Sequence, residues 1–394
     1  MPLPPRTGSN TVNDLTHDLG RGLAGTALHQ AVAARDSGQW DAMHTTARTL
    51  TGQPAVSHPA GASLYRGAPA VAYVLQVAGH PAYRSALGNL DSVLATLVRT
   101  RLADAHHRME AGRPPHMREY DLISGLTGLG ALLLRRGTHP ELLDGVLRYL
   151  VRLLRQPVIL HGEEVPGWWT SDSPSGRPDA AWPTGHGNFG MAHGVAGPIA
   201  LLALSARAGH TVTGQYQALT QCCRLLQERA HHLANGGPAW PETITLDAWL
   251  NRSPAPKRPG RPSWCYGTPG IGRALQLAAI ACSCATTQRL AEDALTTCAA
   301  DPEQLTRVDD ATACHGWAGL CLSVHLAAAD TAPDSALRRV LPFLRSRFAV
   351  HLAQHALPDT AGLLTGGEGT LLALRALDST RPVATGWETC LLLN

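Results

Sequence analysis

The sequence predicts an all-α protein in which inner and outer helices form the two concentric layers of a closed ring. The main observation is a short pattern that recurs seven times along the 394 residues: a glycine, usually a second glycine three residues later, and then an apolar helical run. The copies lie 45 to 73 residues apart, which leaves room for a helix, a turn, a returning helix and a loop. Neither end copy has the polar face of a capping repeat, so a closed ring is favoured over an open solenoid.

The inner layer is predicted from the seven copies themselves. Their apolar runs indicate helices that are buried on most sides, and the glycines before them allow the N-terminal ends of these helices to approach closely. The second copy has Ala70 in place of its second glycine, and the last copy has Glu368 before its second glycine. The copies read GLAGTALHQAVAA from Gly22, GAPAVAYVLQVAG from Gly67, GLTGLGALLLRRG from Gly125, GVAGPIALLALSA from Gly194, GTPGIGRALQLAA from Gly267, GWAGLCLSVHLAA from Gly316 and GGEGTLLALRALD from Gly366.

The outer layer is predicted from returning helices between the copies. Residues 140–155 open with a proline, which suits a first helical turn, and then repeat leucine and valine at helical spacing. Residues 215–234 and 335–354 mix apolar and charged faces in the same way. Such amphipathic helices are expected to cover the inner ring.

Two segments depart from the helical pattern. Residues 156–187 and 235–263 are rich in tryptophan, proline and glycine, and we expect the first to form short strands or a long irregular loop. Both precede candidate functional motifs, so we expect them to shape an entrance or bind a partner. Residues 1–12 are rich in proline, serine and glycine and are expected to be poorly ordered, which leaves residues 13–394 as a single domain.

Composition excludes several classes of protein. A net charge of +3 is too small to indicate nucleic-acid binding. No secretory signal is present and no apolar run of about 18 residues lacks a charge, so we expect a cytoplasmic protein without membrane spans. Nine cysteines in a chain of this length favour core thiols or metal ligands over a disulfide framework.

Two cysteines and a histidine occupy matching places in adjacent copies. WCYG at 264–267 is followed by CHG at 314–316, so Cys265 and Cys314 stand at the same offset from their glycines, with His315 beside the second. Thiolate and imidazole are preferred zinc ligands, and three of them leave one coordination position open. Two thiolates cancel the charge of zinc, which suits activation of an incoming thiol better than hydrolysis. The alternative is two buried thiols and a capping histidine.

Further polar residues stand near the starts of the inner helices. His193 could act as an acid or base near neutral pH or as a fourth zinc ligand, although a lone histidine is often structural. Asp121 could orient His193 or simply cap a helix. Arg261, three residues before Trp264, could stabilise negative charge near the site or be a solvated loop arginine.

These motifs match a known family. The chain resembles the lanthipeptide cyclases of the LanC-like family over essentially its whole length, through the sevenfold glycine pattern, YDLISGLTG at 120–128, NFGMAHG at 188–194, WCYG at 264–267 and CHG at 314–316. The resemblance implies an α/α toroid of seven inner and seven outer helices around a cavity that holds zinc. Bacterial members can carry a small SH2-like extension, which would fall at residues 156–187.

The resemblance also implies roles for individual residues. It makes His193 and Asp121 the acid–base residues, places Arg261, Tyr266 and Trp264 at the substrate pocket, and makes Cys265, Cys314 and His315 the ligands of one Zn²⁺. The implied reaction is a Michael addition in which a peptide cysteine attacks the β-carbon of dehydroalanine or dehydrobutyrine. Protonation of the α-carbon then gives lanthionine or methyllanthionine. The implied partner is a dehydrated precursor peptide, with a dehydratase and an exporter in a modification complex at the membrane.

Three other functions fit parts of the sequence. A relative that adds glutathione or another small thiol to dehydroamino acids would have the same site, so the sequence does not separate it from a cyclase. A zinc-dependent prenyltransferase also uses an α/α toroid, but an aromatic content of 5% argues against a lipid cavity. A non-catalytic peptide-binding scaffold is opposed by the intact set of candidate ligands.

Overall fold

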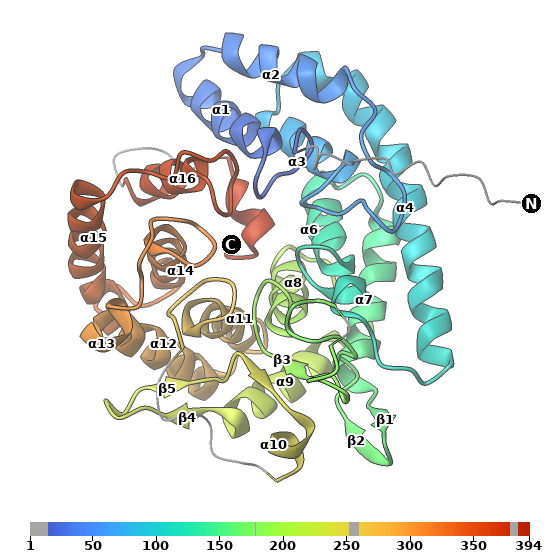
Figure 1. Cartoon of the computed structure of the whole chain (residues 1–394), viewed down its shortest axis with the longest axis vertical. Coiled ribbons are helices and arrows are strands. Elements are labelled where there is room, and N and C mark those ends of the chain that lie inside the picture. The colour runs from blue at the N-terminus through green and yellow to red at the C-terminus, as the bar shows by residue number, and fades with distance from the viewer. Residues whose placement is uncertain (1–14, 178, 252–259, 379–384) are drawn as a thin grey trace, which may run out of the picture.

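The computed structural model describes residues 15–177, 179–251, 260–378 and 385–394, and its inner helices form a closed ring (Figure 1). Each inner helix packs against the next one along the chain, and the last packs against the first. The fold is therefore the expected α/α toroid. The inner helices are α1 (Leu23–Ser37), α3 (Ala68–Ala78), α6 (Leu126–Arg136), α8 (Ala196–Arg207), α11 (Thr268–Ala281), α14 (Trp317–Ala329) and α16 (Gly367–Leu377).

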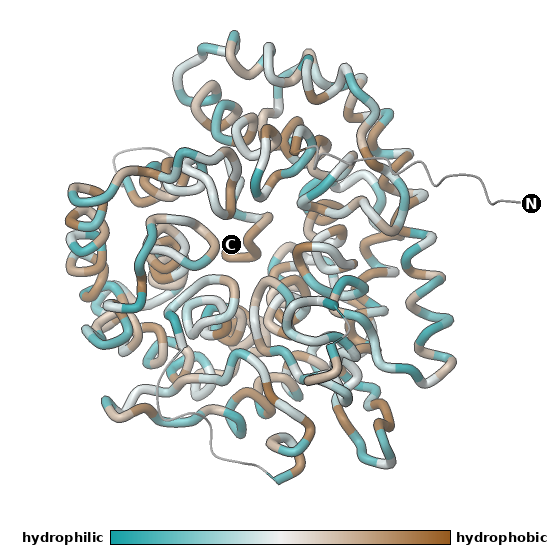
Figure 2. The backbone as a smooth tube through the Cα atoms, in the orientation of Figure 1, coloured by the Kyte–Doolittle hydropathy of each residue, from teal (hydrophilic) through white to brown (hydrophobic). Residues whose placement is uncertain are grey.

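The inner helices are mostly buried because their sequences are predominantly apolar. In α11 every residue from Thr268 to Ala279 is buried, and α3 is buried over almost its whole length. Proline at the first turn of both helices suits a position whose N–H has no helical partner. Figure 2 shows the same contrast, with hydrophobic colour concentrated on the inner ring and alternation of polar and apolar residues along the outer helices.

The outer helices each return against the inner helix that precedes them. In α7 the buried residues include Leu143, Val146, Leu147 and Leu150, which recur at the helical spacing seen in the sequence. The expected helix at 335–354 begins one residue later, at Ala336. The outer helices of the described residues are α2 (Asp41–Thr51), α4 (Arg84–Glu110), α7 (Pro140–Arg155), α9 (Gln215–Arg229), α12 (Ala285–Ala300) and α15 (Ala336–Gln354).

The seventh outer helix expected after α16 is not found in the part of the chain that the structure describes. Residues 379–384 lie outside it, and the chain resumes as the short 3-10 helix η2 (Trp387–Leu391). On α16, Leu371 and Leu374 are more than a third exposed. None of the helices in the described ranges is long and apolar enough to cross a bilayer.

The two segments expected to be irregular contain most of the short elements. The segment 156–187 forms one antiparallel hairpin from β1 (Val158–Leu160) and β2 (Glu163–Val165), which agrees with a short β-containing extension. In the described part of residues 235–263, two short strands pair with earlier strands and one short helix forms. The remaining elements are β3 (Gly187–Asn188) with β6 (Thr243–Ile244), β4 (His231–His232) with β5 (Pro238–Ala239), α5 (Met117–Tyr120), α10 (Leu246–Leu250), α13 (Pro302–Leu305) and η1 (Pro81–Tyr83).

Helix α9 ends earlier than the sequence pattern predicts. The expected helix at 215–234 stops at Arg229, and Ala230 adopts an extended backbone. His231 and His232 then pair with residues 238–239 as a small hairpin. Gly236 in the connecting turn has a φ of +81°, a conformation that favours glycine. Hairpin formation by the Asn-Gly-Gly turn therefore overrides the helical pattern of these last residues.

The C-terminal segment, residues 386–394, lies in the middle of the ring (Figure 1). Trp387 and the residues Cys390 to Leu393 are buried. Polar side chains of the surrounding repeats hold its backbone carbonyls: Tyr73 Oη donates to Trp387 O at 2.5 Å, Tyr65 Oη to Cys390 O at 2.7 Å, Trp264 Nε1 to Leu391 O at 3.0 Å and Arg273 Nε to Leu393 O at 2.9 Å. The chain end is thus part of the core.

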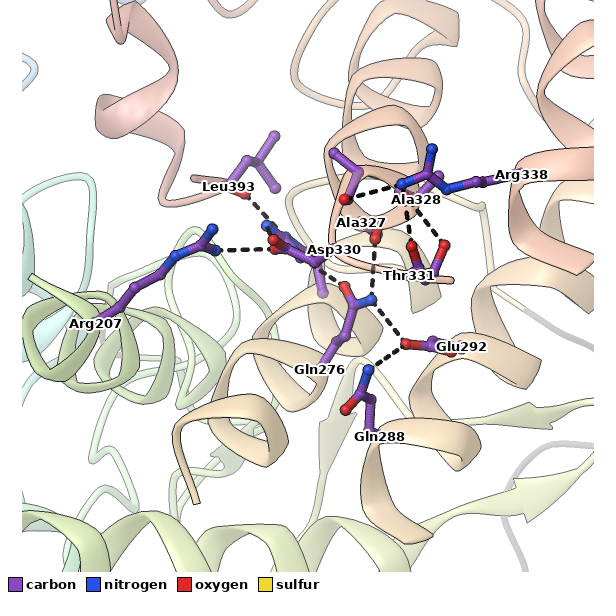
Figure 3. A network of polar contacts seen from close by, with 12 residues as sticks. Arg207, Gln276, Gln288, Glu292, Ala327, Ala328, Asp330, Thr331, Arg338 and Leu393 are labelled. Carbon is purple, nitrogen blue, oxygen red and sulfur yellow. Dashed lines mark hydrogen bonds and ion pairs between the residues drawn. The ribbon is translucent and has the colours of Figure 1, made fainter. Parts of the chain in front are cut away.

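A buried polar network joins this segment to the inner helices (Figure 3). Asp330 Oδ2 accepts from Arg273 Nη2 at 2.8 Å and from Arg207 Nη1 at 3.0 Å. Gln276 Oε1 accepts from Arg273 Nη1 at 2.6 Å, and its Nε2 donates to Ala327 O at 3.0 Å. Helices α8, α11 and α14 and the chain end are therefore connected through one charged cluster.

Candidate metal centre and active site

Backbone hydrogen bonds join neighbouring loops at the N-terminal ends of the inner helices. The residue two positions before the first glycine takes part at each of four successive junctions. Ala192 N–H donates to Cys265 O at 3.1 Å, Cys265 N–H to Cys314 O at 3.2 Å, Cys314 N–H to Leu364 O at 2.9 Å and Leu364 N–H to Gly20 O at 2.8 Å. Equal offsets in adjacent repeats therefore lie side by side, which is why the two cysteines meet.

The second glycine of the pattern lets each inner helix press against its own loop. A Cβ at Gly270 would lie 2.0 Å from Trp264 O, and a Cβ at Gly319 would lie 2.1 Å from Ala313 O. Both contacts are with backbone, which cannot rotate away. The glycines thus fix the distance between the helix and the loop that carries Cys265 or Cys314.

Cys265, Cys314 and His315 form a group of candidate metal ligands, here called the metal trio. One ligand atom from each lies within 4.8 Å of the others, and it is the one such group of three among the described residues. Cys265 is buried, and the other two residues are half-buried. Two thiols and an imidazole at this separation fit Zn²⁺, with one position left for a further ligand.

Neighbouring groups prepare the trio for a metal. A hydrogen bond from the Cys314 thiol, together with one from His315, lowers the pKa of Cys265 despite its burial. Ser263 Oγ lies 3.5 Å from the Cys265 sulfur. The contact between the two cysteines raises the pKa of Cys314, because the thiolate of Cys265 opposes ionisation of the Cys314 thiol. A divalent cation would remove this conflict by stabilising both thiolates.

Asp310 orients His315. Its Oδ2 lies 3.2 Å from His315 Nε2, so Nδ1 is the ring nitrogen left for a metal. This hydrogen bond, followed by that with Cys265, raises the pKa of His315 to about 9. Burial acts to raise the pKa of Asp310, but its hydrogen bonds from His315 and Thr312 outweigh burial and hold it well below the usual range. Metal binding would displace the proton from His315.

His193 and Asp121 form a second pair. His193 Nδ1 lies 2.6 Å from Asp121 Oδ2, and the other carboxylate oxygen accepts from Ser124 N–H at 2.6 Å. Burial acts to lower the pKa of His193, but the charge and hydrogen bond of Asp121 outweigh it, so the pKa is raised above 6.5. The ring of Tyr266 lies 6.2 Å from that of His193, and burial raises the pKa of Tyr266 to about 12.

A central cavity of about 710 Å³ brings these groups together. Asp121, His193, Tyr266 and Cys314 all line it, so the His193–Asp121 pair and the Cys314 member of the metal trio open on the same space. The rest of the wall comes from the loops of the first three repeats, from Arg101 of α4, from the last repeat and from Asp172, Pro174, Ser175 and Gly176. The segment 156–187 thus contributes to the cavity wall, as expected from its place in the sequence.

Two predicted pocket residues lie elsewhere. Arg261 contacts the acidic residues beside His315, with Nη2 at 3.3 Å from Asp309 Oδ2 and Nη1 at 3.8 Å from Asp310 Oδ2. Trp264 is 0% exposed and lies beneath the cavity wall, where it donates to Leu391 O. It therefore connects the Cys265 loop to the C-terminal segment and does not reach the cavity surface.

Sequence reasoning missed Asp310 and Ser263. Asp310 stands six residues before Gly316, and Asn188 stands at the same offset before Gly194. The Oδ1 of Asn188 accepts from Gly190 N–H at 3.0 Å. Ser263 Oγ accepts from Gly267 N–H at 3.1 Å and so organises the loop. Comparing offsets other than those next to the glycine would have indicated both the aspartate and the asparagine.

Comparison with known proteins agrees with this architecture. The family model described as lanthionine synthetase C-like protein matches residues 13–392. A search of curated protein sequences finds no match. Among solved structures, nisin cyclase is similar with a TM-score of 0.75 and 20% sequence identity, over 97% of this chain and 93% of that chain, which shows a shared fold. Because the family model spans nearly the whole chain, the protein belongs to the lanthionine synthetase C-like family.

Proposed function

We propose that the protein is a zinc-dependent cyclase that forms lanthionine or methyllanthionine rings in a dehydrated precursor peptide. The observation that carries this proposal is that the His193–Asp121 pair and Cys314 of the metal trio line one cavity. Family membership and the similarity to nisin cyclase support it. The reaction joins a cysteine sulfur to the β-carbon of a dehydroamino acid and places one proton on the α-carbon.

The metal trio supplies thiol activation in this proposal. Cys265, Cys314 and His315 would hold Zn²⁺, which when bound lowers the pKa of a thiol at its open position and keeps that thiol nucleophilic. Asp310 fixes the ring of His315, and the backbone bond between the two cysteines fixes their separation. A preformed donor set costs little rearrangement when the metal binds.

His193 is the proposed proton donor to the α-carbon. Its raised pKa favours the protonated imidazole, and Asp121 stabilises the imidazolium and holds the ring by Nδ1. Nε2 is then the nitrogen left to exchange protons in the cavity. The proton released by the substrate thiol balances the one delivered to the α-carbon. Tyr266, whose pKa of about 12 keeps its hydroxyl protonated, is a neutral hydrogen-bond donor beside His193.

The proposed substrate is a ribosomally made peptide that another enzyme has dehydrated. The cavity of about 710 Å³ holds several residues, and holding both reacting groups there makes ring closure an intramolecular reaction in a fixed geometry. A dehydratase that produces the substrate and an exporter that removes the product are the proposed partners. The proposed location is the cytoplasm, where the precursor peptide is made.

The test is ring formation in a purified system. The protein is incubated with a dehydrated peptide that carries free cysteines, and remaining thiols are counted by N-ethylmaleimide labelling and mass spectrometry. Ring closure leaves the peptide mass unchanged and removes thiols. Cys314→Ala should abolish the reaction, whereas Cys282→Ala, a half-buried thiol at the other end of α11, should retain it. Persistence of all thiols with the wild-type protein would contradict the proposal.

A further inference from the structure

The wall of the central cavity has two chemically different parts. Repeats four to six supply His193, Tyr266 and Cys314, whereas the loops of the first three repeats and helix α4 supply four arginines: Arg21, Arg66, Arg101 and Arg118. Arg21 and Arg66 stand directly before their glycines, which is the offset of His193 and His315 in the later repeats. Arg21, Arg66 and His193 line the cavity from this same offset, so the position carries different chemistry on different sides of the ring.

The carboxylates of this cavity already have partners. Asp121 is paired with His193. Asp172 accepts from His116 Nδ1 at 2.7 Å and from Met117 N–H at 2.9 Å. Asp18 Oδ1 accepts from the backbone N–H of Arg21 at 2.7 Å. Among the described residues, none of these three carboxylates makes an ion pair with a cavity arginine.

Two of the four arginines have structural partners and two do not. Arg101 donates to the carbonyls of Ser124, Pro59 and Ala62, and Arg118 Nη2 donates to Ala60 O at 3.0 Å. In the described part of the chain, the guanidinium groups of Arg21 and Arg66 make no hydrogen bond or ion pair, and both residues are exposed. Burial, and after it the nearby charge of Arg118, lower the pKa of Arg101.

Backbone bonds hold the two unpaired arginines on adjoining loops. Leu19 N–H donates to Tyr65 O at 2.9 Å, and Gly67 N–H donates to His17 O at 2.9 Å. Asp18 and Arg66 form a β-bridge. Arg21 and Arg66 also precede α1 and α3, whose N-terminal ends carry partial positive charge. The backbone of both arginines is therefore held in place before any ligand binds.

We propose that Arg21 and Arg66 form a carboxylate-binding site that recognises an acidic group of the peptide substrate while its reacting residues lie beside His193 and the metal trio. Planar guanidinium groups bind carboxylates in a two-point geometry that neutral side chains cannot match. The acidic group is either an Asp or Glu side chain or the C-terminal carboxylate of the peptide. This inference rests on the proposed function, because it assigns the substrate class of the same cavity.

The test compares binding of matched peptides. Three fluorescein-labelled peptides carry one cysteine and one dehydroalanine: one has Glu and a C-terminal amide, one has Gln and a C-terminal amide, and one has Gln and a free C-terminal carboxylate. Their dissociation constants are measured by fluorescence anisotropy with wild-type protein and with the double variant Arg21→Gln/Arg66→Gln. The control is Arg84→Gln/Arg99→Gln, which removes the same charge from exposed positions on α4 outside the cavity.

We expect an acidic peptide to bind the wild-type protein roughly tenfold more tightly than the neutral one, as for a charged hydrogen-bonded contact. The double variant should lose this preference, and the control should keep it. A preference for the Glu peptide identifies a side-chain carboxylate, and one for the free C-terminus identifies the terminal carboxylate. Equal binding of all three peptides to the wild-type protein, or an unchanged preference in the double variant, would overturn the inference.

Ring closure measured on the same peptides separates this inference from the proposed function. Cyclisation of all three peptides with no charge preference in binding would overturn the carboxylate site and leave the cyclase proposal standing. A charge preference that disappears in the double variant, without cyclisation of any peptide, would support the site and contradict the cyclase proposal.

Discussion

The buried network in Figure 3 allows a matched test of how the chain end is held. Arg273 and Arg207 bind the same oxygen of Asp330, at 2.8 and 3.0 Å, but their side chains are 1% and 55% exposed. We therefore compare Arg273→Met with Arg207→Met. Each substitution removes one guanidinium and keeps an unbranched apolar side chain.

The expected magnitudes follow from burial and partners. Arg273 also donates to Leu393 O at 2.9 Å and Gln276 Oε1 at 2.6 Å, so its loss leaves buried acceptors unpaired. Although burial lowers the pKa of Arg273 to about 10, the side chain is charged at pH 7. Removing one member of a buried ion pair costs about 3–5 kcal/mol of unfolding free energy. Removing the exposed Arg207 should cost about 0–1 kcal/mol, because solvent screens that pair.

The assay is equilibrium urea unfolding at pH 7, with hydrogen exchange of residues 386–394 as a local readout. Arg273→Met should lower the unfolding midpoint and speed exchange in the C-terminal segment, whereas Arg207→Met should change neither by much. Equal losses for the two variants, or no loss for Arg273→Met, would refute the view that the chain end is held by this arginine.

Three further predictions concern the site. Trp264→Phe removes the donor to Leu391 O at 3.0 Å and should cost about 1–3 kcal/mol of unfolding free energy, measured by urea unfolding. It should also weaken metal retention, measured as metal content. Unchanged stability and unchanged metal content would contradict the positioning role of Trp264. Because the pKa of His193 is raised, its imidazolium is lost only as the pH rises through the folded pKa, and the cyclisation rate should fall in that range. Asp121→Asn should move this fall in rate to lower pH. An unchanged pH profile in Asp121→Asn would exclude a role for the His193–Asp121 pair. Gly270→Ala places a Cβ 2.0 Å from Trp264 O and should destabilise the protein by about 1–3 kcal/mol in thermal unfolding. The control Gly88→Ala on α4, where the Cβ meets open space, should not destabilise it. Equal effects of the two substitutions would show that close approach at Gly270 does not matter for stability.

The inner ring and the metal trio could be predicted because both follow from repetition. Equal offsets from a glycine become neighbouring positions once the ring closes, and the backbone bond from Cys265 to Cys314 is the direct result. The same reasoning predicted that His193 would lie near the trio, and the structure places His193 and Cys314 on one cavity. Residue offsets are enough when a fold is built from equivalent units.

The features that the sequence did not predict depend on contacts outside the repeat. Trp264 lies beside a ligand in sequence, yet it points away from the cavity because the C-terminal segment offers a carbonyl there. The sequence also did not predict that the backbone carbonyls of Leu391 and Leu393 accept hydrogen bonds from the surrounding repeats. A run of three leucines indicates only that the segment is buried. The early end of α9 depends on pairing of His231 and His232 with residues 238–239, a contact that competes with helical propensity.

We propose that Cys265, Cys314 and His315 hold a metal. The most direct test is the zinc content of the purified protein, with Cys314→Ala as the variant and Cys282→Ala as the matched cysteine control. We expect about one zinc ion per folded chain in the wild-type protein and in Cys282→Ala. Cys314→Ala should lose this zinc while its circular dichroism spectrum stays unchanged. Absence of zinc from the wild-type protein, or full zinc content in Cys314→Ala, would contradict the account.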